Sequence, residues 1–189
     1  MMLVVESHQL NQMILSISHD YLTPERIDLL ARLAPLHDIG KVGVPDSLLN
    51  KPGALTVEET LEMRKHPAHG RDVIVHAEQD VGVPDDVTLA MAKDIVYTHH
   101  EKWDGTGYPE GLRGVEIPIV GRLMALVDVY DAITTRRVYR DSMSHDEAVA
   151  FIVAERGTHF DPSVVDAFLD VAEAVRRLSV DSDRGAAAR

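Results

Sequence analysis

The stretch Leu36-His37-Asp38-Ile39-Gly40-Lys41 organises this chain of 189 residues. An apolar, helix-like run leads into it, and a Gly-Lys pair ends it. Adjacent residues on a helix point about 100° apart, so His37 and Asp38 can reach two points of one pocket. A neutral imidazole and a carboxylate suit a divalent metal ion, and the carboxylate can bridge two ions. One such pair means little by itself, so the case depends on the other His and Asp residues of the chain.

The composition limits what the protein can be. Its length fits one domain with a sizeable core. The chain has no cysteine, so any metal must be held by nitrogen and oxygen atoms. The net charge of −12 argues against binding to long nucleic acids or anionic membranes. No apolar run is long enough to cross a bilayer, and the start lacks the basic leader of a signal peptide, so we expect a cytoplasmic protein.

Apolar residues recur at helical spacing along most of the chain, and no alternating pattern supports a sheet. The expected fold class is therefore all-α. Thr23, Thr56 and Ser144 are expected to cap helices, and Pro35 to kink one. His66 is expected near the end of the helix that starts at Thr56. Helices are expected over 7–18, 23–36, 56–63, 70–79, 84–98, 119–136, 144–156 and 162–178, loops over 42–53 and 103–114, and a flexible tail over 179–189.

Further candidate ligands are His66, the adjacent pair His99 and His100, and Asp128. Helix bundles build metal sites from such side chains, which project inward from several helices. Each residue also has a structural interpretation: His66 as a surface or capping histidine, and the pair as a solvated helix end. That interpretation is weakest for Asp128, which lies amid apolar residues, because an unpaired buried carboxylate is costly. Together these residues favour a metal site.

Several blocks of the sequence form a recognisable series: His37-Asp38-Ile39-Gly40-Lys41, His66-Pro67-x-x-Gly70, His99-His100-Glu101-Lys102-Trp103-Asp104-Gly105-Thr106-Gly107-Tyr108-Pro109, Val127-Asp128-Val129-Tyr130-Asp131-Ala132, Arg137-x-Tyr139-Arg140 and Gly157-x-x-Phe160-Asp161-Pro162. These blocks resemble the HD-GYP domain, a subgroup of the HD superfamily of metal-dependent phosphohydrolases. The resemblance runs from about residue 25 to residue 170 and implies an HD-domain helical bundle with a Gly-rich GYP loop of Gly107, Tyr108 and Pro109. We therefore expect one catalytic domain over 1–178, with a divergent first helix within 1–24.

The resemblance implies a phosphodiesterase that hydrolyses cyclic di-GMP to linear pGpG, with GMP as a further product, using two divalent ions, iron or manganese. Asp38 and Lys41 would be the catalytic residues, Lys41 by stabilising charge on the phosphate. Arg137 and Arg140 would grip phosphates, as Lys41 also would. The first ion would be held by His8, His37, Asp38 and Asp128, and the second by Asp38 as the bridge together with His66, His99 and His100.

The chain departs from the family pattern near its start. Asn11 stands where the family usually has an Arg, three residues after the first histidine, and His19 is the alternative to His8. Val4 replaces the Glu of three-metal members, which is why two ions are expected. The usual amino-terminal receiver or sensor domain is missing, so the chain is a stand-alone enzyme or a catalytic fragment.

Three functions remain open at this point. The first is the cyclic di-GMP phosphodiesterase, and the second is a phosphohydrolase of another cyclic dinucleotide or nucleotide. The third is a non-catalytic module that binds cyclic di-GMP or docks partners. The GYP loop is the expected surface for a protein partner, and the oligomeric state stays open, with a dimer as one candidate.

Overall fold

The computed structural model describes residues 21–82, 86–135 and 142–187. These ranges contain helices and turns but no strand, so the expected all-α fold is confirmed. No helix in them is long and apolar enough to cross a membrane. The helices are α2 (Pro24–Leu33), α3 (Asp46–Leu49), α4 (Val57–Met63), α5 (His66–Val81), α6 (Val87–Thr98), α7 (Ile119–Thr134), α8 (His145–Ala154) and α9 (Pro162–Ala187), with 3-10 turns η1 (Ala34–Leu36), η2 (Ile39–Gly43) and η3 (Gly114–Glu116).

The helix starts follow the local capping signals of the sequence. The Thr23 hydroxyl accepts a hydrogen bond from the first turn of α2. Thr56 and Ser144 each form the expected capping box with a glutamate three residues later. Regular helix stops at Leu33, and the chain continues as a 3-10 turn through Pro35, in line with the expected kink. Because a cap satisfies backbone N–H groups that would otherwise lack partners, these boundaries are fixed by a few neighbouring residues.

Other boundaries differ from the sequence prediction. His66 begins α5 and does not lie near the end of the preceding helix, because the proline after it fits the first turn of a helix. The predicted loop 42–53 contains the short helix α3, which follows Pro45 and has an acidic residue in its first turn.

Two further helices have different ends from those expected. Helix α6 begins at Val87 because the Asp86 carboxylate accepts the N–H groups of Thr88 and Leu89, at 2.7 and 3.1 Å. Helix α9 passes the expected end at residue 178 and reaches Ala187. The added segment has no proline and ends in two consecutive alanines, Ala186 and Ala187, and alanine is the best helix former.

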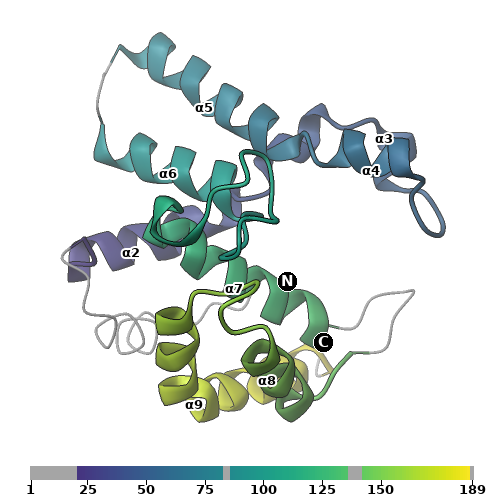
Figure 1. Cartoon of the computed structure of the whole chain (residues 1–189), viewed down its shortest axis with the longest axis vertical. Coiled ribbons are helices and arrows are strands. Elements are labelled where there is room, and N and C mark those ends of the chain that lie inside the picture. The colour runs from purple at the N-terminus through teal and green to yellow at the C-terminus, as the bar shows by residue number, and fades with distance from the viewer. Residues whose placement is uncertain (1–20, 83–85, 136–141, 188–189) are drawn as a thin grey trace.

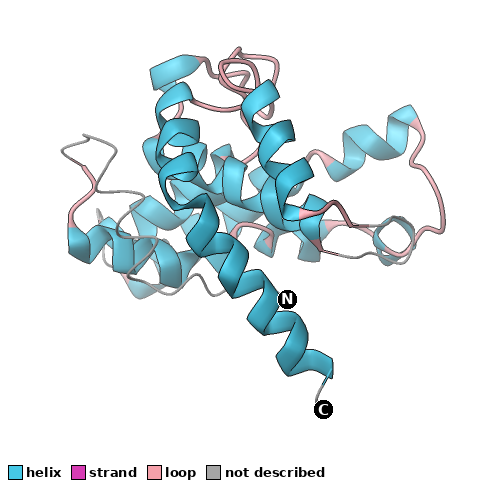
Figure 2. Ribbon diagram, turned by 90° about the horizontal axis from the view of Figure 1, so that it is seen from below, coloured by secondary structure: helices cyan, strands magenta, loops and turns pink. Residues whose placement is uncertain are grey.

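Helix α7 runs through the middle of the molecule (Figure 1). Helices α5 and α6 lie on one side of it, and α8 and α9 lie on the other. The main core packs around α7, and its largest fully buried side chains include Ile27, Met91, Ile95, Leu126 and Phe160. Figure 2 shows the end of α9 extending away from the other helices. A smaller apolar cluster, Ile74 with Ala92 and Val96, joins α5 to α6.

Two glycines allow the elements that carry the candidate ligands to approach closely. A Cβ atom at Gly40 would lie 1.9 Å from the backbone oxygen of His66, which no side chain can do. A Cβ atom at Gly70 would lie 2.3 Å from Cγ1 of Val96. Glycine at these positions therefore lets η2 pack on α5 and lets α5 pack on α6. This packing brings Asp38 beside His66.

Candidate metal centre

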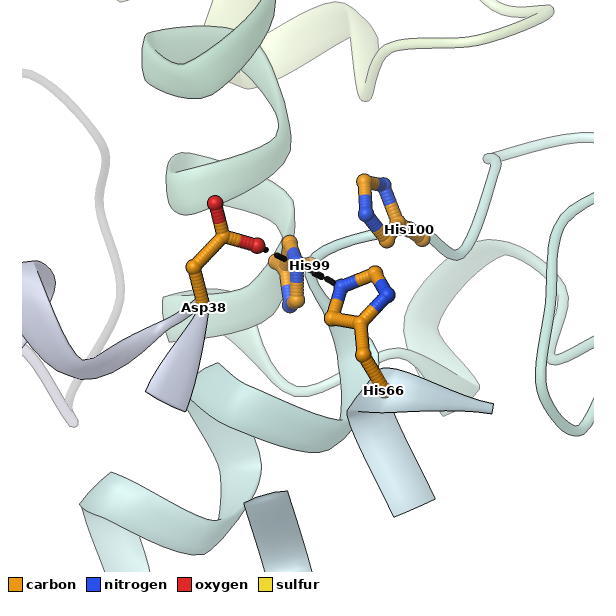
Figure 3. Close-up of side chains that lie close together, drawn as sticks. All are labelled: Asp38, His66, His99 and His100. Atoms are coloured by element: carbon orange, nitrogen blue, oxygen red, sulfur yellow. Dashed lines mark hydrogen bonds and ion pairs between the residues drawn. The ribbon is translucent and has the colours of Figure 1, made fainter. Parts of the chain in front are cut away.

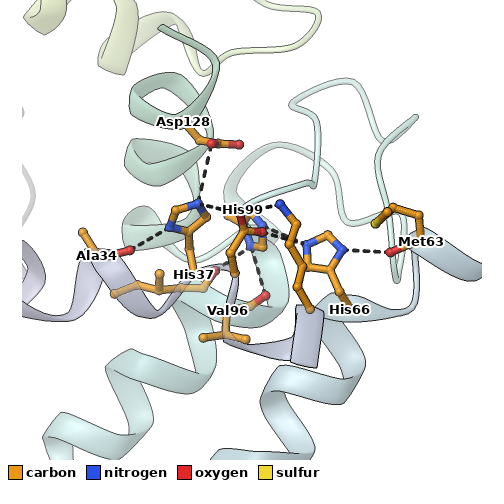
Figure 4. Close-up of polar contacts among 10 residues, drawn as sticks. Ala34, His37, Met63, His66, Val96, His99 and Asp128 are labelled. Carbon is orange, nitrogen blue, oxygen red and sulfur yellow. Dashed lines mark hydrogen bonds and ion pairs between the residues drawn. The ribbon is translucent and has the colours of Figure 1, made fainter. Parts of the chain in front are cut away.

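Asp38 lies at the point where three elements meet. It follows His37 in the short connection between η1 and η2. Its Oδ2 atom lies 3.4 Å from His37 Nε2, and its Oδ1 atom lies 3.4 Å from His66 Nε2. His37 Nε2 also lies 3.6 Å from Oδ1 of Asp128, which comes from α7 (Figure 4). One carboxylate therefore faces two groups of candidate ligands, as the sequence predicted for a bridging residue.

The second group is formed by three histidines. His66 begins α5, His99 caps the end of α6, and His100 follows it. Ligand atoms of Asp38 and these three histidines all lie within 4.8 Å of one another (Figure 3). His66 and His99 are each only 1% exposed. We call His66, His99 and His100 the histidine half of the centre, and His37 with Asp128 the carboxylate half, with Asp38 between them.

Backbone carbonyls orient the imidazole rings. The Nδ1 atom of His37 lies 2.8 Å from the Ala34 oxygen, and that of His66 lies 2.9 Å from the Met63 oxygen. His99 Nδ1 makes the same kind of contact with the carbonyls of residues 95 and 96 (Figure 4). A ring nitrogen beside a carbonyl must carry the proton, so these contacts fix the tautomer and turn Nε2 towards the centre.

The histidine half is neutral near pH 7. Burial lowers the pKa of His66. Burial together with the neighbouring histidines lowers the pKa of His99 to about 4 and that of His100 to about 3. Each ring therefore keeps a free lone pair, which is the form that binds a metal ion.

The carboxylate half holds a proton. Burial alone would lower the pKa of His37, but its contacts with Asp128 and Asp38 outweigh this and raise the pKa to about 10. Burial would likewise raise the pKa of Asp38, yet the contacts with His37 and Lys41 hold it well below its usual range. The Lys41 ammonium donates to Asp38 Oδ2 at 2.5 Å. His37 is therefore an imidazolium between two carboxylates.

These donors fit a divalent metal. His66 Nε2 and His99 Nε2 lie 3.4 Å apart, and both rings carry their proton on Nδ1. Two lone pairs then face each other, an arrangement that becomes favourable when a cation lies between them. Imidazole and carboxylate are also the ligands that suit transition metals such as iron, while carboxylate suits manganese. The cluster is thus a preformed site of nitrogen and oxygen donors.

The GYP loop lies directly against the histidine half. The Tyr108 ring stacks on the His100 ring, with centroids 4.8 Å apart and an angle of 27° between the planes. Gly107 lies where a Cβ atom would be 2.3 Å from the backbone nitrogen of Lys102, so only glycine fits. Pro109 follows in a cis peptide bond. The loop therefore covers one face of the His100 ring and lies beside the candidate site, as expected from the sequence.

Glu101 holds this loop in place, a role that the sequence reasoning missed. Its side chain is 1% exposed, and its carboxylate accepts the backbone N–H groups of Glu110, Gly111 and Leu112 at 2.8, 3.2 and 3.0 Å. The only signal in the sequence was the position of Glu101, directly after two candidate ligands.

Other predicted site residues lie outside the described part of the chain. These are His8, with its alternative His19, and the two arginines Arg137 and Arg140. Their roles therefore stay predictions. The structure brings together the remaining candidate ligands, His37, Asp38, His66, His99, His100 and Asp128, with Lys41 beside Asp38.

Comparisons with known proteins agree with this geometry. The family model of the HD domain matches residues 4–164. The chain belongs to the HD-domain family. This confirms the family expected from the motifs. A solved structure described as Bd1817, an HDG"Y"P protein from Bdellovibrio bacteriovorus, has the same fold, with a TM-score of 0.62 and 22% identity over 90% of this chain and 51% of that one.

Several curated HD-domain relatives carry functional names. One from Vibrio cholerae, named cyclic di-GMP phosphodiesterase, is 57% identical over 80% of this chain and 30% of its own length. Another from the same organism, named 3′3′-cGAMP-specific phosphodiesterase 2, is 39% identical over 82% of this chain and 28% of its own. The response regulator RpfG of Xanthomonas campestris is also named a cyclic di-GMP phosphodiesterase. It is 39% identical over 78% of this chain and 37% of its own length. The chain spans about a third of the length of these relatives.

Proposed function

We propose that this chain is a metal-dependent phosphodiesterase that hydrolyses cyclic di-GMP to linear pGpG, with GMP as a further product. The observation that carries the proposal is the placement of Asp38 between the histidine half and the carboxylate half. Such a shared carboxylate is what a two-metal site for phosphate chemistry requires. The names of relatives at 57% and 54% identity support the same substrate.

The proposed cofactors are two divalent ions, iron or manganese. When bound, such ions lower the pKa of a water molecule and offset the charge on phosphate oxygens. Asp38 would serve both ions. The remaining ligands of the first ion would be His37 and Asp128 with His8, and those of the second His66, His99 and His100.

Residues of the chain itself would bind and orient the substrate. Lys41 is partly exposed and lies beside Asp38, so its ammonium can donate to an oxygen of the phosphate under attack. Arg137 and Arg140 would grip phosphate oxygens with their guanidinium groups. Tyr108 stacks on His100 and so keeps water from one face of that ring.

The wider setting belongs to the same proposal. We assign residues 1–178 to one catalytic domain and place the protein in the cytoplasm. The loop of Gly107, Tyr108 and Pro109 would be the surface for a protein partner, and a dimer is the assembly to test first.

A second candidate substrate is 3′3′-cGAMP. Relatives named as specific for this cyclic dinucleotide are 39% and 38% identical to the chain. Both substrates share the cyclic ring with two phosphodiester bonds, so the same metal centre would serve either. A non-catalytic module is disfavoured because the described candidate ligands form an intact set.

One assay separates these functions. Protein purified without oxygen is loaded with Mn²⁺ or Fe²⁺ and given cyclic di-GMP or 3′3′-cGAMP, and the products are separated by chromatography. We expect pGpG from cyclic di-GMP, at a higher rate than product from 3′3′-cGAMP. The reverse order of rates would favour the second substrate. Tight binding of cyclic di-GMP without any product would support the non-catalytic module and contradict the proposal.

A further inference from the structure

Arg64 places a cation one aromatic ring away from the candidate metal centre. This exposed residue caps the end of α4, two residues before His66. Its guanidinium carbon Cζ lies 4.9 Å from the centroid of the Tyr108 ring. The same ring stacks on His100. From the surface towards the centre there follow in space the Arg64 guanidinium, the Tyr108 ring and the His100 imidazole.

Arg64 forms no ion pair with any residue in the described ranges, although the chain carries a net charge of −12. Its neighbour Lys65, in contrast, pairs with Glu62 at 2.5 Å. Contact with an aromatic face leaves the in-plane N–H groups of a guanidinium free to donate hydrogen bonds. The Tyr108 ring thus positions a planar fork of donors that has no acidic partner among these residues.

A cyclic dinucleotide substrate would give the Arg64 guanidinium a partner. A cyclic dinucleotide carries two phosphodiester groups, and only one of them can lie at the metal centre beside Lys41. The other keeps its negative charge and needs a donor further out. Because a guanidinium can donate two parallel hydrogen bonds to phosphate oxygens, we propose that Arg64 binds the phosphate that is not under attack. This inference rests on the proposed function and adds a residue to its substrate site.

The chain offers a matched control. Arg71 on α5 has its guanidinium carbon 4.0 Å from the centroid of the Tyr97 ring, so it makes the same kind of contact as Arg64. The Tyr97 hydroxyl donates to Glu110, and none of the ring contacts among described residues joins Tyr97 to the histidine half. Arg71→Ala therefore removes a stacked arginine at a place without a candidate ligand.

The test compares two esters. Cyclic di-GMP has two phosphodiester groups, and bis(p-nitrophenyl) phosphate has one. We expect Arg64→Ala to raise the KM for cyclic di-GMP about tenfold, and to lower the ratio of kcat/KM for cyclic di-GMP over that for the small ester by the same factor. Arg71→Ala should change this ratio by less than about twofold. The metal content of both variants, measured by elemental analysis, should equal that of the wild type.

Three results would overturn the assignment of Arg64 while leaving the proposed function intact. The first is a wild-type ratio in Arg64→Ala. The second is a loss of metal with an equal fall for both esters, which would mean that Arg64 acts through Tyr108 and His100. The third is a loss on cyclic di-GMP that is absent with cyclic di-AMP, which would mean a contact with the guanine base. A wild type that cleaves the small ester but neither binds nor cleaves a cyclic dinucleotide would instead overturn the proposed function and this inference together.

Discussion

The two halves of the candidate metal centre differ in how they hold protons. In the histidine half, burial keeps the rings neutral, with the pKa of His99 lowered to about 4 and that of His100 to about 3. In the carboxylate half, Asp128 and Asp38 overcome the effect of burial and raise the pKa of His37 to about 10. One half thus presents free lone pairs, whereas the other already contains a cation in the form of an imidazolium.

This difference predicts the order in which the two halves bind their metal ions. A metal ion entering the histidine half meets ligands in their binding form. An ion entering the carboxylate half must first displace the proton of His37, so its affinity depends more strongly on pH. Asp38 belongs to both halves and couples them. We therefore expect the histidine half to bind its ion first at neutral pH.

Removing the shared carboxylate should have the largest effect. Asp38→Ala takes a ligand from both ions, so we expect metal content near zero and a loss of turnover greater than about a thousandfold. Elemental analysis and chromatography of the products measure the two quantities. Asp46→Ala, at an exposed carboxylate in the first turn of α3, is the control and should behave like the wild type. Two ions retained in Asp38→Ala would show that the halves are not joined by this residue.

Single substitutions in each half should separate the two ions. His99→Ala should remove the ion of the histidine half, and Asp128→Ala that of the carboxylate half, each leaving one ion per chain. Both variants should lose turnover by more than about a hundredfold, since both ions act on the same phosphate. Metal content after dialysis is the measurement. If either variant lost both ions, the two halves would be a single site.

Lys41 should affect turnover more than affinity. Its proposed partner is the phosphate under attack, so Lys41→Ala should lower kcat by roughly ten- to a hundredfold with little change in KM. Steady-state kinetics with cyclic di-GMP tests this, with Lys65→Ala as the control for a lysine that pairs with a glutamate outside the cluster. A raised KM with normal kcat would instead make Lys41 a binding residue.

The smallest effect expected is on the stability of the metal-free protein. The unfolded chain binds protons on His99 and His100 near pH 6.5, whereas the folded chain binds them only near pH 4 and 3. The free energy of unfolding should therefore fall as the pH drops below 6.5. His37 acts in the opposite sense: its contribution is complete below pH 6.5 and is lost as the pH rises towards 10.

Thermal unfolding of the metal-free protein between pH 3 and pH 10 checks both expected pH dependences, the loss of stability in acid and the loss of the His37 contribution in base. Below pH 6.5, the slope of the free energy of unfolding against pH reports the number of protons taken up on unfolding. His100→Asn should reduce that number by about one. An unchanged acid slope in this variant would mean that His100 does not stay neutral in the folded chain.

Much of the fold and of the centre could be predicted because the signals are local. Caps at Thr23, Thr56 and Ser144 fix helix starts, and short motifs contain the candidate ligands. The predicted position of His66 was wrong in detail: it was expected near the end of the helix that starts at Thr56, whereas it begins α5, with Pro67 in the first turn.

The remaining features depend on how the backbone runs around the motifs. The carbonyl that orients the His66 ring belongs to the end of α4, and the amides that hold Glu101 lie nine to eleven residues further along the chain. The contact of Arg64 with Tyr108 joins two segments that no motif connects. Residue types alone do not encode these approaches, so only the folded chain shows them.

Stepwise loading with metal tests whether hydrolysis needs an ion in both halves of the centre. Metal-free protein is titrated with Mn²⁺ in the absence of oxygen, and bound metal and pGpG formation are followed in the same samples. We predict that the first equivalent of Mn²⁺ binds with little activity and that hydrolysis of cyclic di-GMP rises with the second, reaching its maximum near two ions per chain. Full hydrolysis at one ion per chain, or hydrolysis by the metal-free protein, would contradict this prediction.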